Sequence, residues 1–169
     1  MTISMYAASV PLFVRGLTSM RSVLVKAESH AQTKKIADTV FVTARLSPDM
    51  LPLAKQVQIA SDFARSTTAR LAGKEPPPIE DNESTFAELI ARVDKTLDYL
   101  KPFTAGEIDG SEERQVTRTI RGQPRTFTGV NYLQNFALPN FYFHCAMAYG
   151  ILRHNGVELG KADFLGPLE

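Results

Sequence analysis

A continuous helical pattern near the C-terminus, residues 133–156, most constrains what this chain can fold into. Apolar residues recur there at spacings of three, four and seven, which places them on one face of an α-helix. They are Leu133, Ala137, Phe141, Ala148 and Leu152. Asn155 and Gly156 predict the end of the helix, and Pro139 predicts a kink or a separate first segment. A helix with such a face needs other elements to cover it.

Two polar residues accompany this apolar stripe, Asn140 and His144, one helical turn apart. Imidazole titrates near neutral pH and is a common metal ligand, so His144 is the residue best suited to chemistry. The lone cysteine, Cys145, follows it directly and lies about 100° around the helix, so it should point elsewhere. The sequence thus offers one candidate imidazole with one polar neighbour.

Three earlier stretches, residues 5–31, 53–71 and 86–100, show the same helical periodicity. Pro11 lies inside the first stretch and predicts a kink or a separate first turn. The third stretch begins with a threonine and a glutamate spaced as in a capping box, which marks a helix start. Together with the last helix, these stretches predict a bundle of four helices.

The connections between the stretches predict the order of this bundle. Residues 36–46 lose the periodicity, which predicts a loop. Ser47 and Pro48 then predict a helix start, and Pro52 predicts that the main helix starts again there. Residues 74–84 contain three consecutive prolines, which favour an extended path rather than a tight turn. A connection of that length lets the third helix run parallel to the second, on the far side of the bundle.

Residues 107–129 differ in character from the rest of the chain. They are rich in β-branched and aromatic residues around a Gly/Pro turn at 121–124, which predicts a small β-hairpin on the end of the bundle. Its arginines favour a solvated face over a phosphate site. The predicted fold is therefore all-α: one domain, residues 1–169, forming a four-helix bundle with a hairpin between helices three and four.

Composition and charge exclude several function classes. The 169 residues are long enough for one domain with a proper core, and 19 basic against 18 acidic side chains leave a formal charge of +1. This balance predicts no binding of nucleic acid or of an anionic membrane. The N-terminal region predicts neither a signal peptide nor a membrane span. A single cysteine suits a reducing compartment, so we expect a soluble, cytoplasmic protein.

The segment HCAMAYGILRHNG, residues 144–156, resembles the last-helix motif of the DinB/YfiT-like superfamily, in which a histidine opens a long apolar helix ending in Leu-Arg-x-x-Gly. The early MYAASVPLFVRGL and the later QVQIASDFA are similar to the same superfamily, in an uncharacterised bacterial branch known only as a domain of unknown function. The resemblance covers essentially the whole chain. It implies a four-helix bundle in up-down-down-up order and a homodimer.

The resemblance also implies where a metal would bind. Metal-binding members use three histidines, one on the second helix and two, spaced by four, on the last. The matching positions here are Gln58, Asn140 and His144, with Asp62 one turn beyond Gln58. Carboxamides are poor ligands for zinc or nickel, and His144 is the single matching ligand position. We therefore expect no resident metal or cofactor, with a bound zinc or nickel ion as the alternative.

Three functions remain open. The first is a non-catalytic or small-ligand-binding protein in which Gln58, Asp62, Asn140 and His144 form a polar pocket. The second is a metal-dependent transferase or hydrolase acting with a low-molecular-weight thiol, with His144 as base or ligand. We expect the first rather than an enzyme, because no acid or nucleophile is seen to converge on His144.

The third possibility is an interaction protein. The last helix carries more aromatic residues than one buried face requires, and Tyr142 with Phe143 could pack against a second copy of the chain. A homodimer is the expected assembly.

Overall fold

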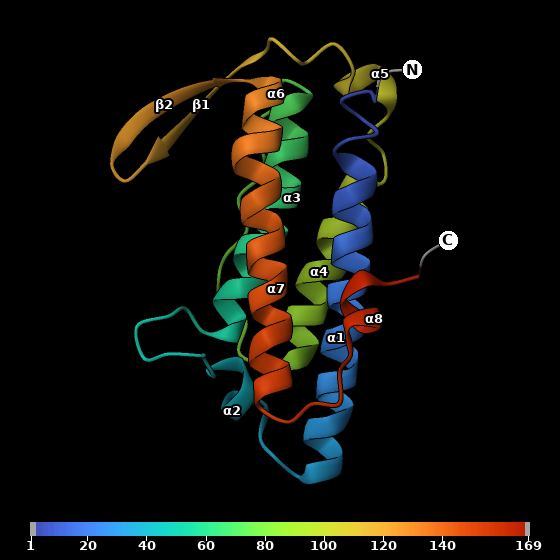
Figure 1. Ribbon diagram of the computed structural model, residues 1–169, viewed down its shortest axis with the longest axis vertical. Helices are drawn as coiled ribbons and strands as arrows, with labels where there is room; N and C mark the ends of the chain where they lie inside the picture. The colour runs from blue at the N-terminus through green and yellow to red at the C-terminus, as the bar shows by residue number, and fades with distance from the viewer. Residues whose placement is uncertain (1–2, 168–169) are drawn as a thin grey trace.

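Four long helices packed along their lengths form the body of the protein (Figure 1). The computed structural model describes residues 3–167, so the outermost two residues at each end of the predicted domain lie outside it. The long helices are α1 (Val10–Lys34), α3 (Leu53–Leu71), α4 (Phe86–Leu100) and α7 (Leu138–His154). The predicted helical bundle is confirmed.

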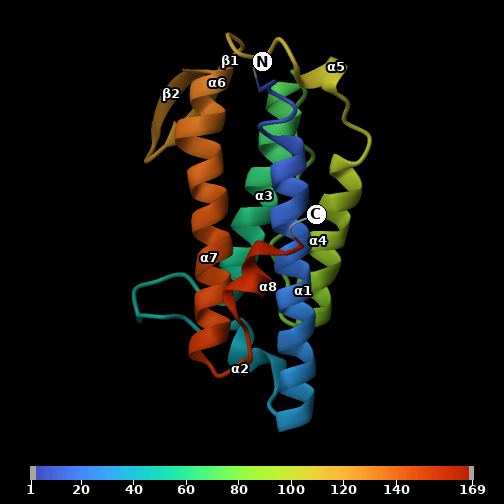
Figure 2. The same cartoon turned by 45° about the vertical axis from the view of Figure 1, so that its right-hand side comes forward.

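The helices run in up-down-down-up order, since α1 and α7 point one way and α3 and α4 the other (Figures 1 and 2). The proline-rich segment 74–84 has no regular secondary structure and returns along the bundle, so that α4 starts at the same end as α3. The predicted capping box closes the start of α4. The Glu88 amide donates to Thr85 Oγ1 at 3.2 Å, and the Thr85 amide donates to Glu88 Oε2 at 3.0 Å.

A buried arginine of α4 fixes the returning segment in place. The side chain of Arg92 is 1% exposed, and its Nη2 lies 3.1 Å from Asp62 Oδ1 on α3 and 2.9 Å from Asp81 Oδ1. Its Nη1 donates to Glu83 Oε1 and to the Glu80 carbonyl, both at 2.9 Å. Burial works against the charged form, but these carboxylates together raise the pKa of Arg92 above its ordinary value. The segment is therefore held by charge as well as by its prolines.

Pro11 does not kink α1; it lies in the first turn, where a missing N–H leaves no hydrogen bond unmade. Residues 5–9 form a separate turn before the helix, so of the two predicted outcomes the separate first turn is confirmed. One predicted helix start is wrong. Ser47 caps no long helix, because its hydroxyl donates to Asp49 Oδ1 at 2.7 Å and α3 begins after Pro52. The predicted loop before it contains a short helix, α2 (Asp38–Val42).

The predicted hairpin is present. Strands β1 (Gln115–Ile120) and β2 (Gln123–Thr128) pair antiparallel after a short helix, α5 (Ala105–Ile108). The two turn residues both have left-handed backbones, Arg121 at φ 51° and Gly122 at φ 76°. Such a turn matches the twist of the strands it joins. The hairpin extends sideways from one end of the bundle (Figure 1).

The chain enters α7 through two short segments, α6 (Gly129–Asn131) and a π-helical segment, η1 (Tyr132–Ala137). Pro139 sits in the first turn of α7, directly after the π-helical segment, so the predicted separate first segment is confirmed. Proline removes one backbone donor from a helix. Beside it, Asn140 Nδ2 donates to the Phe136 carbonyl at 2.6 Å.

A glycine lets α1 and α7 approach each other closely. A Cβ at Gly16 of α1 would lie 2.6 Å from Phe141 Cε1 of α7. Phe141 is fully buried and meets Phe13 edge to face, with ring centroids 5.0 Å apart. This crossing sets the separation of the two helices that border the cavity described below.

Candidate functional site

The side chain of His144 points from α7 towards α3, where it meets Gln56. His144 Nδ1 lies 2.7 Å from Gln56 Oε1, and Gln56 Nε2 donates to the Leu51 carbonyl at 2.9 Å. Because the amide nitrogen of Gln56 is used, its oxygen accepts and His144 Nδ1 carries the proton. The bond to Gln56 thus fixes a proton on Nδ1, so in the neutral imidazole the lone pair lies on Nε2.

Aromatic rings surround this histidine. Phe63 stacks on it with centroids 6.3 Å apart, and Phe143 meets it edge to face at 5.2 Å. His144 is 9% exposed, and this burial lowers the pKa of its imidazole below the ordinary value. Burial therefore favours the neutral form of His144.

The other predicted site residues are engaged elsewhere. Gln58 Nε2 donates to Glu83 Oε2 at 2.8 Å, and Asp62 accepts from Arg92. Both thus belong to the charged cluster around Arg92, while Asn140 bonds to the backbone of its own helix. Within residues 3–167, no hydrogen bond joins Gln58, Asp62 or Asn140 to His144.

Sequence reasoning missed Gln56. It lies four residues before Ala60 and three after Leu53, on the helix face that packs against α7. Gln58 lies about 200° further around the helix, at 100° per residue, and faces the proline-rich segment instead. The apolar stripe of α3 was the signal that could have identified Gln56.

The donors near His144 do not fit a transition metal. In the part of the chain that the structure describes, no group of three or more His, Cys, Asp or Glu side chains could hold a metal ion. Gln56 Oε1 accepts from His144 itself, and the Asn140 amide serves its own backbone. Carboxamides are also weak ligands for zinc or nickel. We therefore derive no chemistry through a metal.

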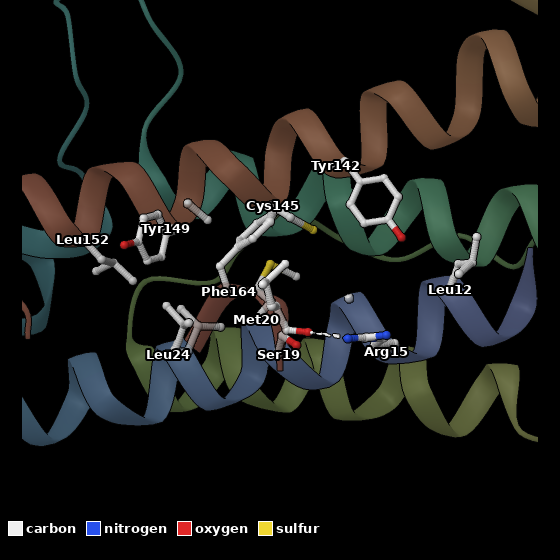
Figure 3. A pocket seen from close by; sticks show the side chains of 14 residues that line it. Leu12, Arg15, Ser19, Met20, Leu24, Tyr142, Cys145, Tyr149, Leu152 and Phe164 are labelled. Atoms are coloured by element: carbon white, nitrogen blue, oxygen red, sulfur yellow. Dashed lines mark hydrogen bonds between the residues drawn. The ribbon is translucent and has the colours of Figure 1, made fainter. Parts of the chain in front are cut away.

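A cavity of about 240 Å³ lies between α1, α7 and the short helix α8 (Lys161–Leu165) (Figure 3). Its walls are mostly apolar. The lining residues are Leu12, Arg15, Gly16, Ser19, Met20, Val23, Leu24, Tyr142, Cys145, Ala148, Tyr149, Leu152, Phe164 and Leu165. Sequence reasoning did not identify this cavity.

Small side chains on facing helices leave this space. Gly16 and Ser19 of α1 and Cys145 and Ala148 of α7 all line the cavity, and all four side chains are small. The Phe164 ring from α8 reaches in between α1 and α7 (Figure 3). It packs edge to face on Tyr149, with centroids 5.9 Å apart. Helix α8 therefore forms one wall of the cavity.

Two cations of α1 hold α8 in place. Arg15 Nε and Nη2 each donate to the Leu165 carbonyl at 3.2 Å. Lys26 Nζ donates to Asp163 Oδ1 at 2.6 Å, and Asp163 Oδ2 accepts from the Gly160 amide at the start of α8. These contacts involve exposed groups, so each adds little to stability, and together they orient α8 against α1.

The cysteine in the cavity wall is not a reactive thiol. Cys145 is 5% exposed, and burial raises its pKa to about 12. The thiolate is the nucleophilic form, so at neutral pH this side chain acts as a small apolar group. As predicted, Cys145 points away from His144: it faces α1, and His144 faces α3.

Comparisons with known proteins agree with this architecture. A crystal structure of a DinB family member protein from Shewanella denitrificans is 39% identical in sequence and superposes with a TM-score of 0.90, over 96% of this chain and 92% of that one. Among curated proteins, none matches the sequence. Within residues 3–167, no helix is both long and apolar enough to cross a membrane.

A family model matches nearly the whole described chain. It spans residues 5–165 and is described as a domain of unknown function, DUF1993. The family match and the DinB-like fold both confirm the resemblance drawn from the last-helix motif. The chain belongs to the DUF1993 family and has the DinB fold.

Proposed function

We propose that this protein binds a small, largely apolar molecule in the cavity between α1, α7 and α8, without catalysing a reaction on it. The observation that supports this is the cavity itself, about 240 Å³ with mostly apolar walls. An engineered apolar cavity of about 150 Å³ is large enough to bind benzene. Binding sites for small molecules are commonly such concave, apolar spaces with a few polar groups.

The cavity walls support binding rather than catalysis. The fourteen lining residues include no histidine, lysine or carboxylate that could act as a general acid or base. The one thiol, Cys145, is protonated at neutral pH. The alternative function, a metal-dependent transferase or hydrolase acting with a thiol, lacks support because the donors around His144 do not fit a metal.

A homodimer in the cytoplasm is part of this proposal. Tyr142 is 39% and Phe143 is 53% exposed on α7, and exposed aromatic side chains are typical of protein interfaces. Light scattering after gel filtration tests the assembly, with Phe143→Ser as the variant expected to give monomers. A monomeric wild-type protein at micromolar concentration would contradict the dimer.

Calorimetric titration with hexan-1-ol, a neutral probe, tests the binding proposal. Wild-type protein should bind the probe, and Ala148→Leu should abolish binding because the larger side chain fills the cavity. Ala146→Leu is the matched control, since Ala146 lies on the same helix outside the cavity lining. Equal binding by wild type and Ala148→Leu, or no binding by wild type, would contradict the proposal.

A further inference from the structure

We propose that the natural ligand is a small amphipathic monocarboxylate whose carboxylate binds Arg15 at the mouth of the cavity. This inference rests on the proposed function, because the apolar body of the ligand occupies the cavity described above. It adds the chemical class of the ligand and the residue that selects it.

Arg15 is the single charged residue among the fourteen that line the cavity. Its Nε and Nη2 hold the Leu165 carbonyl, and within residues 3–167 its Nη1 has no hydrogen-bond partner. A guanidinium with a free nitrogen can donate a charge-assisted hydrogen bond to a carboxylate. Arg15 is exposed, so the ligand's charged end stays near water while its body is buried.

Arg15 and the Tyr142 hydroxyl lie towards the same end of the cavity. Figure 3 shows both there, together with Leu12, while Leu24, Leu152 and Tyr149 lie at the other end. Burial raises the pKa of Tyr142, and the charged form of Cys145 raises it further. The positive charge of Arg15 lowers the pKa of Tyr142, because Arg15 lies near its hydroxyl. Since the Tyr142 hydroxyl lines the same end of the cavity as Arg15, we assign it as a second donor for the same carboxylate (Figure 3).

The nearby charges favour an anion over a cation. Among residues 3–167, no carboxylate lines the cavity, and the acidic residue of α8, Asp163, is already paired with Lys26. A cationic ligand would meet Arg15 without a compensating charge. A neutral ligand would accept a weaker hydrogen bond from the free nitrogen than a carboxylate would. Charge complementarity therefore singles out an anionic head group.

The test compares hexanoate with hexan-1-ol, which have the same chain length, by calorimetric titration at neutral pH. The wild type should bind hexanoate about tenfold more tightly, the expected effect of a hydrogen bond to a charged group. Arg15→Gln should lose this preference and keep its affinity for hexan-1-ol. Arg15→Lys should retain most of the preference. The matched control is Arg153→Gln, an exposed arginine of α7 outside the cavity, which should behave as wild type.

Three outcomes would overturn the proposal, and they are distinguishable. Equal binding of both probes by wild type refutes the anionic ligand and leaves the proposed function standing. Equal loss of both probes in Arg15→Gln shows that Arg15 acts only by holding α8. Binding of neither probe by wild type contradicts the proposed function itself.

Discussion

His144 on α7 donates its Nδ1 proton to Gln56 on α3, across 2.7 Å in the interior of the bundle. The imidazole thereby ties two long helices together instead of facing the cavity, which lies on the other side of α7. The residue best suited to chemistry in the sequence is therefore satisfied within the core, and the candidate binding site is built from residues with little chemical character.

The His144 pair predicts a loss of stability in acid. Burial lowers the pKa of His144 in the folded protein, while the unfolded chain keeps the ordinary value of about 6.5. As the pH falls below that value, the unfolded state binds a proton that the folded state does not, so the free energy of unfolding decreases. Urea unfolding between pH 7.5 and pH 5 measures this. His144→Gln should show a smaller decrease, and an identical decrease in both proteins would contradict the assignment.

The cluster around Arg92 predicts that the stability of the fold depends strongly on this one side chain. Arg92→Ala should lower the free energy of unfolding by about 3 kcal/mol, because it leaves the largely buried carboxylate of Glu83 without a cation. It also removes one of two cations from each of Asp62 and Asp81, which keep Arg65 and Lys55. The control is Arg21→Ala, which breaks an exposed pair with Asp94 and should cost less than about 1 kcal/mol. Chemical denaturation compares the two. Equal costs would show that the Arg92 cluster is not structurally important.

Close packing of α1 on α7 predicts opposite effects at two glycines. Gly16→Ala should lower the free energy of unfolding by about 2 kcal/mol, because the new Cβ collides with the buried ring of Phe141. Gly150→Ala, in α7, meets its nearest atom at 3.8 Å and should be neutral or stabilise by about 0.5 kcal/mol. Urea midpoints measure both. Similar changes at the two positions would contradict the close approach.

The side chains around His144 predict that zinc does not bind to the folded protein and does not stabilise it. Addition of zinc should leave the Tm unchanged, since a ligand that binds only the folded protein would raise it. Differential scanning calorimetry of tag-free protein provides the measurement, with His144→Ala as the control. A rise in Tm that disappears in this variant would revive a metal-dependent function.

The sequence predicts the helices well and their rotations poorly. Periodicity gave the four long helices, and the residues around Thr85 and Gly156 gave two of their ends. The effect of prolines was harder to predict, because a proline such as Pro11 can lie in the first turn of a helix as readily as it can kink one. Gln58 was expected beside His144 because the resemblance placed the second-helix ligand position there, whereas the apolar stripe of α3 turns Gln56 towards α7.

The cavity could not be predicted from the sequence. It depends on which small residues of α1 and α7 face each other, such as Gly16 and Ala148, and on where α8 docks. Periodic patterns assign each of these residues to an apolar face but do not say that the space between the faces is left unfilled. That information comes from helix separations, which only the folded chain defines.

A crystal structure of the protein soaked with 6-bromohexan-1-ol tests the central claim most directly. The bromine gives an anomalous signal that locates the ligand without any assumption about its site. The account predicts one strong peak inside the cavity, between Ala148 and Phe164. A cavity closed by side chains or by a second copy of the chain, with no bromine peak inside it, would contradict the account.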